Sequence, residues 1–293
     1  MTTIYLDCET LPDLRPGKRD ACIQAARDNF KAPSTLTKEQ AAADLGLTDA
    51  SEIKFTSKDA MLARWAERFR EEKADEVGDA EWRKTSFDGA KGQLCCIGVA
   101  LDDSDPITLY GSEHAILTDF FLIVDSHIRQ NNLRRPTFVG HNLAAFDLRF
   151  IFQRAVINRV PVPVWFPRNA RPWDDSINDT MLMWAGHAGR ISLANLCEAL
   201  GVESDNDMDG SMVCDMYLQG QIAKIAEYCA DDVRITRECW QLMTLTLDNL
   251  SAQVNTAAIA PPAMTLIGWP RSIANDRRPP ISTARTSRLF YEE

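Results

Sequence analysis

Alternation of apolar and polar residues at the N-terminus predicts the first element of the fold. The stretch TTIYLDCE predicts a β-strand over residues 2–9, because successive side chains of a strand point to opposite faces. Ile4, Leu6 and Cys8 then share one apolar face. The other face presents two carboxylates, those of Asp7 and Glu9. The alternative is a solvent-facing strand with ordinary acids.

Short apolar runs and helical periodicities alternate along the rest of the chain. Residues 92–112 predict a hairpin, and TFVGHN over 137–142 predicts a further strand. Helical patterns cover the remaining regular segments, which are 112–130, 144–158, 179–185, 192–200, 212–218 and 220–246. This order of elements indicates an α/β domain with a mixed sheet.

The stretch between the first two predicted strands, about eighty residues, is far longer than an ordinary connection. It carries helix signals of its own: a capping box at Thr37, and a charged helix after Ser57 with an apolar face formed by Met61, Leu62, Trp65 and Phe69. We therefore expect a helical insertion at about 13–91 within a domain spanning 1–250. Pro261 and Pro262 begin a less regular part of the C-terminal extension 251–293, which contains proline and arginine.

Charge and composition narrow the classes of function. The net charge of −10 argues against broad binding to a duplex backbone, while a nucleic-acid enzyme with a local site and bound cations stays open. The eight cysteines form no C-x-x-C pair, which favours reduced thiols in the core. No run of about 18 apolar residues occurs, so we expect no membrane partner and a cytoplasmic location.

Two further acidic positions accompany the first strand. In GHNLAAFDLRF, Asn142 is placed to cap the following helix and Asp147 falls in its first turns. In EYCADDVRIT, helical geometry places Asp232 at the border of an apolar stripe, with Tyr228 one turn earlier, whereas Asp231 faces solvent. Taken singly, each group also has an ordinary structural explanation. Asp147 could be an acid near a helix N-terminus, and Tyr228 and Asp232 could be a tyrosine and an acid at the margin of a helix.

The ordered patterns D-x-E, N-x-x-x-F-D and Y-x-x-x-D resemble those of the DnaQ-like 3′ to 5′ exonucleases with tyrosine in the third motif, the DEDDy branch. ISLANLCEALGV and DMDGSMV extend the likeness to stand-alone phage and bacterial exonucleases related to the proofreading domain of family B DNA polymerases. The resemblance covers 2–10 and 91–245. It implies an RNase H-like mixed five-stranded sheet flanked by helices. Related exonucleases often carry a lysine before the DGS segment, where this chain reads ESDNDMDGS.

Gathered carboxylates require a cation. Two unit charges about 4 Å apart repel by about 4 kcal/mol at an effective dielectric near 20, and oxygen ligands suit Mg²⁺ or Mn²⁺. By the resemblance, two such ions are held by Asp7, Glu9, Asp147 and Asp232, and Tyr228 orients the attacking water. These five residues form the implied catalytic set. The implied reaction is two-metal hydrolysis at the 3′ end of single-stranded DNA, releasing nucleoside monophosphates, by a bacterial or phage enzyme.

The implied substrate contacts are His141, Asn142 and Phe146, for which structural roles are the alternative. RNA is an open alternative substrate, because the motifs do not report the sugar. A non-catalytic nucleic-acid or protein-interaction module on the same fold is a second alternative. The sequence does not identify a replication or repair protein as a partner. On the insertion, Arg64, Arg68, Arg70 and Lys73 could contact a single strand, with Trp65 or another aromatic for stacking, or could be solvated charges. Asp205, Asp207 and Asp209 copy half of a calcium loop, but its twelfth position is Met216.

Overall fold

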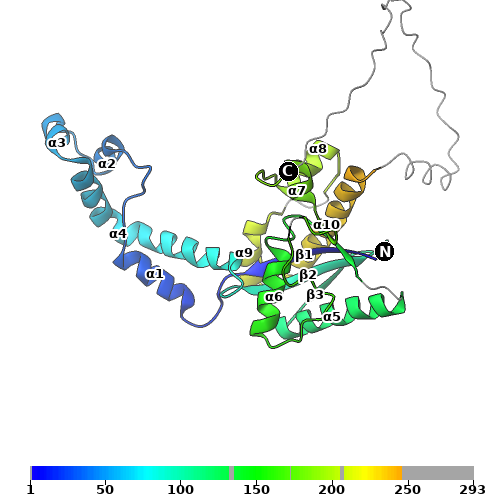
Figure 1. Ribbon diagram of the computed structural model, residues 1–293. Helices are drawn as coiled ribbons and strands as arrows, with labels where there is room; N and C mark the ends of the chain where they lie inside the picture. The colour runs from blue at the N-terminus through cyan, green and yellow to red at the C-terminus, as the bar shows by residue number, and fades with distance from the viewer. Residues whose placement is uncertain (1, 132–134, 172, 205–207, 246–293) are drawn as a thin grey trace, which may run out of the picture. The chain divides into compact units, whose positions relative to one another are not determined.

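A mixed five-stranded sheet forms the centre of the protein. The computed structural model describes residues 2–131, 135–171, 173–204 and 208–245 (Figure 1). The strand order is β3-β2-β1-β4-β5, so the strand with the first two acids lies in the middle. β1 pairs antiparallel with β2 and parallel with β4, which makes the sheet mixed as expected.

The elements follow the predicted order closely. The strands are β1 (Thr3–Leu11), β2 (Gln93–Leu101), β3 (Ile107–Tyr110), β4 (Thr137–Gly140) and β5 (Ile177–Asp179). The helices outside the insertion are α5 (Glu113–Gln130), α6 (Asp147–Ile157), α7 (Thr180–Ala185), α8 (Leu193–Leu200), the 3₁₀ turn η2 (Gly210–Met212), α9 (Val213–Leu218) and α10 (Ile222–Met243).

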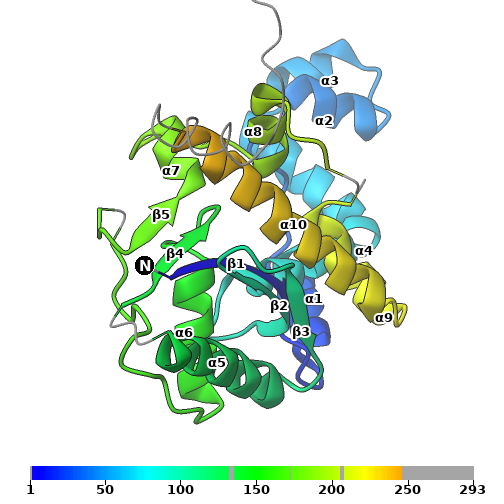
Figure 2. The same ribbon diagram turned by 90° about the vertical axis from the view of Figure 1, so that its right-hand side faces the viewer.

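Helices cover both faces of the sheet. α5 and α6 lie on one face and α10 crosses the other, as Figure 2 shows. The first face buries the largest core cluster, which includes Ile4, Leu6 and Cys8 as the alternation predicts. The second face packs Tyr5 against Val233 and Trp240 of α10. Because Asp7 and Glu9 share the face of Tyr5, β1 turns its two carboxylates toward α10.

The segment between β1 and β2 is helical, as expected. It contains α1 (Lys18–Asp28), α2 (Lys38–Asp44), α3 (Ala50–Phe55), α4 (Lys58–Arg83) and the 3₁₀ turn η1 (Lys84–Phe87). The capping box at Thr37 and the Ser57 cap are both present. α2 and α4 enclose a core around Met61 and Trp65, and the Trp82 indole donates to the Asp13 carbonyl at 2.8 Å, which ties α4 to the end of β1.

Three expectations are corrected by the structure. Residues 177–179 form the short strand β5, which the sequence reading did not find, and the helix expected near 179 begins at Thr180. α6 begins at Asp147, later than expected, and its N-cap residue is Phe146. Asn142 does not cap it, because a backbone φ of 58° places Asn142 in a left-handed turn.

Some expectations fall on residues that the structure does not describe. The extension 251–293 lies outside the described residues, as do residues 205–207 of the calcium-like loop. Residues up to Leu245 belong to one compact unit. All eight cysteines are free, and all but Cys22 are buried, as expected for core thiols. Among the described helices, none is long and apolar enough to cross a membrane.

Candidate active site

Three carboxylates from the two ends of the domain meet over the centre of the sheet. Asp7 and Glu9 come from β1, and Asp232 comes from α10. One carboxylate oxygen from each lies within 4.8 Å of the others. Glu9 is only 9% exposed, and Asp7 and Asp232 are partly buried. The arrangement therefore concentrates negative charge in a place with little solvent.

A glycine on the neighbouring strand lets α10 approach closely enough for this meeting. Gly98 of β2 lies opposite Asp7 in the register of the sheet. A methyl group at Gly98 would lie 2.9 Å from the Cys229 carbonyl oxygen and 2.9 Å from Val233 Cγ2 of α10. Only a residue without a side chain fits there, and the Cys229 thiol reaches the Asp7 carboxylate at 3.5 Å. The position of Asp232 thus depends on contacts on β2.

Asp147 joins the site from the other neighbour of β1. Parallel pairing between β1 and β4 extends only to Tyr5 and Val139. Three residues later, the Cys8 backbone N–H donates to Asp147 Oδ1 at 3.0 Å. Asp147 is 3% exposed and stands at the first position of α6. The loss of strand pairing beyond Tyr5 leaves room for this carboxylate between the positions of Asp7 and Glu9.

Burial and mutual repulsion make all four carboxylates reluctant to ionise. Burial, with the charge of Asp147, raises the pKa of Asp7 to about 8. Burial also raises the pKa of Asp147 to about 7, and burial with the charge of Asp7 raises the pKa of Asp232 to about 8. The pKa of Glu9 lies well above its ordinary value for the same reasons. These raised pKa values indicate that no positive charge of the described residues compensates the carboxylates.

The residues present fit divalent cations. Within the described part of the chain, no lysine or arginine forms an ion pair with any of the four carboxylates. The donors are hard carboxylate oxygens, which suit Mg²⁺ and Mn²⁺. A buried acidic cluster with no cationic side chain is stabilised when ions neutralise it.

Tyr228 lies one turn before Asp232 on α10, where the helix pattern placed it. Its hydroxyl interacts with the Asp232 carboxylate and lowers the pKa of that acid. Burial, followed by the charges of Asp232, Glu9 and Asp7, raises the pKa of Tyr228 above its ordinary value. The phenol is therefore protonated at neutral pH and is a hydrogen-bond donor at this position.

The neighbouring acids have structural partners. Asp231 was expected to face solvent, but its carboxylate is only 11% exposed because it pairs with Arg234 and accepts from Ser204. Asp179 is the N-cap of α7, and it also accepts from the backbone N–H of Asn142 at 3.0 Å.

Two insertion residues considered for strand contacts are engaged within the protein. Trp65 is buried in the insertion core, so it is not available for stacking on a base. Arg64 pairs with Glu52.

The three predicted substrate contacts lie along the turn that leads into α6. His141 uses both ring nitrogens within the protein, at 2.9 Å to Thr180 Oγ1 and 2.9 Å to the Ile191 carbonyl oxygen. Asn142 borders a pocket, and its Oδ1 is buried without a hydrogen-bond partner. Phe146 is partly buried against the main core. The structure thus engages both ring nitrogens of His141 and leaves the buried side-chain oxygen of Asn142 without a partner.

An exposed aromatic beside Phe146 was missed by the sequence analysis. Phe87, in η1 at the end of the insertion, is 72% exposed and lies 6.2 Å from Phe146 between ring centroids. The turn η1 also contacts β1. The insertion therefore delivers an aromatic ring next to the residue that precedes Asp147. No local pattern marks Phe87, because its position depends on packing between distant segments.

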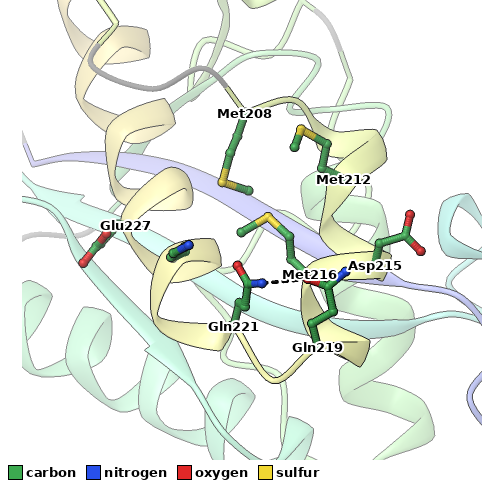
Figure 3. Close-up of a pocket in the computed structure, with 8 residues that line it drawn as sticks. Met208, Met212, Asp215, Met216, Gln219, Gln221 and Glu227 are labelled. Carbon is green, nitrogen blue, oxygen red and sulfur yellow. Dashed lines mark hydrogen bonds between the residues drawn. The ribbon is translucent and has the colours of Figure 1, made fainter.

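A methionine-lined groove of about 600 Å³ lies beside Tyr228. Met208, Met212 and Met216 converge on it, spaced by four residues, as Figure 3 shows. Met208 and Tyr228 pack against the same buried cluster, which also contains Leu11 of β1. Methionine side chains adapt to irregular and aromatic ligands, and polar residues such as Gln221 and Lys224 complete the lining of this groove. The spacing of four was visible in the sequence but had no assigned role.

Comparison with known proteins finds a family match for the second half of the domain. A family model described as a predicted 3′-5′ exonuclease related to the exonuclease domain of PolB matches residues 101–266, more than half of the chain. The match includes Asp147, Tyr228 and Asp232, whereas Asp7 and Glu9 precede it. Searches of curated proteins and of solved structures found no match.

Proposed function

This chain belongs to the family of predicted 3′-5′ exonucleases related to the exonuclease domain of PolB, and we propose that it removes nucleotides one at a time from the 3′ end of single-stranded DNA. The observation that carries the proposal is the convergence of Asp7, Glu9 and Asp232, with their oxygens within 4.8 Å. Asp147 adds a fourth carboxylate through Cys8. The location of this cluster on a central strand provides the rigidity that metal ligands need.

Two divalent cations, Mg²⁺ or Mn²⁺, fit this set of ligands. Asp7, Glu9 and Asp232 would hold one ion, and Asp7 with Asp147 would hold the other, as the likeness to the DEDDy branch implies. When bound, the ions supply Lewis acidity that activates water and stabilises the negative charge on the oxygen that leaves.

The residues of the chain orient the reaction. The protonated Tyr228 hydroxyl positions the attacking water, since the raised pKa of this phenol excludes it as a general base at neutral pH. The water oxygen bonds to the phosphorus of the last nucleotide, and the bond from that phosphorus to the preceding O3′ breaks. O3′ takes up a proton, so the products are a nucleoside 5′-monophosphate and a strand shorter by one residue.

Two features support a single strand as substrate. Phe87 and Phe146 present aromatic surface beside Asp147, and sequence-independent stacking is the usual way to hold unpaired bases. The net charge of −10 disfavours extensive contact with a duplex backbone.

The test is a cleavage assay on strands labelled at either end. With Mg²⁺ or Mn²⁺, the wild-type protein should release labelled mononucleotide at once from a 3′-labelled single strand and shorten a 5′-labelled one stepwise. EDTA or Asp7→Ala should abolish both. The same assay on RNA and on duplexes with recessed ends separates the alternative substrates. Metal-independent cleavage, or full activity of Asp7→Ala, would refute the proposal.

A further inference from the structure

A second pocket borders the turn between β4 and α6 and contains two arginines. Its volume is about 340 Å³. Its apolar lining residues include Ala144, Ala145, Ala170, Met181 and Leu182. Its polar lining residues are Asn142, Arg149, His187 and Arg190. We refer to it as the arginine pocket.

Among the described residues, neither pocket arginine is paired with a carboxylate. Among the described residues, neither Arg149 nor Arg190 forms an ion pair or a side-chain hydrogen bond, and both are exposed. Other arginines of this acidic chain are paired, such as Arg154 with Glu113 and Arg234 with Asp231. Two unpaired guanidinium groups at one pocket create a local positive potential on a protein of net charge −10. Such a pocket attracts anions.

Asn142 adds an unmet hydrogen bond at the same place. Its Oδ1 is buried without a partner, which, among the described side chains, is true of only one other atom, Trp240 Nε1. Leaving a buried acceptor unpaired costs about 1–3 kcal/mol. A base that reached this oxygen with an N–H donor would remove that cost. A backbone phosphodiester has no hydrogen-bond donor and an internal deoxyribose has no free hydroxyl, so in a DNA strand such a donor is an N–H group of a base.

The pocket is fixed to the turn that carries Asp147. His141 bonds the Ile191 carbonyl oxygen and Thr180 Oγ1, and this holds Arg190 and the start of α7 next to Asn142. The Phe146 N–H donates to the Asn142 carbonyl oxygen at 3.0 Å, which closes the turn immediately before Asp147. One closed turn therefore contributes to both the arginine pocket and the acidic site.

An exposed aromatic ring lies beside His187 of the pocket. Trp173 is 68% exposed and lies 6.1 Å from His187 between ring centroids. Exposed aromatic rings beside free arginines are the combination by which proteins hold single-stranded nucleic acid without regard to sequence. An isolated inorganic anion would make no use of Trp173.

We propose that the arginine pocket binds the nucleotides that precede the terminal residue of a single strand, with backbone phosphates at Arg149 and Arg190 and a base N–H donor at Asn142. The inference rests on the proposed function, because the same turn would then present the strand to Asp147. It assigns Arg149 and Arg190 to substrate binding, outside the acidic site.

The test compares two charge-matched double variants with the wild-type chain. R149Q/R190Q removes the pocket arginines, and the control R135Q/R159Q removes two exposed arginines elsewhere that also lack ion pairs among the described residues. The affinity for a fluorescent oligothymidylate of about twenty nucleotides is measured with Ca²⁺ in place of Mg²⁺, between about 50 and about 200 mM salt. R149K/R190K retains the charge and checks for a merely structural effect.

Each lost phosphate contact on a single strand reduces the slope of log affinity against log salt by about 0.7. R149Q/R190Q should therefore bind more weakly than the control at low salt, with a slope smaller by about 1.4, and the difference in affinity should shrink about sevenfold over this fourfold salt range. R149K/R190K should keep most of the wild-type slope. A slope and affinity for R149Q/R190Q equal to those of the control would overturn the assignment.

A small substrate separates this inference from the proposed function. The p-nitrophenyl ester of thymidine 5′-monophosphate has no preceding nucleotide, so its hydrolysis by the wild-type protein reports the acidic site alone. If the wild-type protein cleaves neither the ester nor the strand, the proposed function fails. If it cleaves both while R149Q/R190Q binds the strand like the control, only the arginine pocket fails.

Discussion

The Asp147 carboxylate accepts a hydrogen bond from the Cys8 backbone N–H at 3.0 Å, although 139 positions separate the two residues. The contact fixes the start of α6 against the central strand, between two acids of that strand. Asp147 therefore has a structural partner in addition to the metal role proposed for it.

Substitutions at Asp147 should separate these two roles. Asp147→Asn retains an acceptor for the Cys8 N–H, so the protein should keep its stability while cleavage falls about a hundredfold or more. Asp147→Ala leaves the buried N–H unpaired and should in addition lose about 1–3 kcal/mol in the free energy of unfolding. Urea denaturation and strand cleavage measure the two effects. Equal stability of the two variants would contradict the structural role.

The raised pKa values predict how the stability of the metal-free protein depends on pH. Asp7 and Asp232 have pKa values of about 8 in the folded state, against about 4 in an unfolded chain. Between these values the folded state binds more protons, so raising the pH destabilises it. This stabilising contribution is complete below about pH 4 and is lost as the pH passes 8.

The variant Asp7→Asn isolates this effect from the other titrating groups. In EDTA, the melting temperature of Asp7→Asn minus that of the wild type should grow between pH 5 and pH 9. Added Mg²⁺ should stabilise the wild type more at pH 8 than at pH 5, and the variant little at either pH. A difference that stays constant or shrinks with pH would show that Asp7 is not repelled in the folded state.

Gly98 should control the distance between α10 and the acids of β1. Gly98→Ala places a methyl group 2.9 Å from atoms of Cys229 and Val233, which should cost about 1–3 kcal/mol and displace Asp232. The rate at which this variant cleaves a single-stranded substrate should fall together with its free energy of unfolding. Gly210→Ala is the control for stability, because its added methyl meets no atom within 4 Å. A wild-type melting temperature for Gly98→Ala would mean that α10 does not need this close approach.

The exposed ring of Phe87 should bind substrate and contribute little to the fold. Phe87→Ala should weaken binding of a single strand by about 1–3 kcal/mol, the usual value of one stacked base, while the melting temperature stays unchanged. Phe55→Ala is the matched control, because Phe55 on α3 is also a largely exposed ring, at 83% against 72% for Phe87. Identical strand affinities of the two variants would remove Phe87 from the site.

The sequence predicted the parts of this fold that rest on periodicity. Alternation along β1 separated Leu6 from Asp7 correctly, and the apolar stripe of α10 selected Asp232 over Asp231. Elements with no periodicity were missed: β5 has three residues, too few for alternation to be visible. The helix-cap role expected of Asn142 was wrong, because a left-handed turn cannot be distinguished from a helix cap by residue type alone.

Features built by tertiary packing left no local signal. Phe87 meets Phe146 only when the end of the insertion packs beside β1, and Arg190 reaches the arginine pocket only because His141 holds the adjacent loop. Asp231 is covered by Arg234 and Ser204, which helical geometry alone did not reveal. Patterns along one element predict its faces, whereas contacts between elements require the fold.

The most direct measurement of the central claim compares the cleavage rates of Asp232→Asn and Asp231→Asn with that of the wild type, on a 3′-labelled single strand with Mg²⁺. The two acids are neighbours on α10, but only Asp232 lies with Asp7 and Glu9. We expect Asp232→Asn to slow mononucleotide release by about a hundredfold or more, and Asp231→Asn to stay within a few-fold of the wild type. Wild-type release by Asp232→Asn, or equal losses in both variants, would contradict a catalytic site formed by these carboxylates.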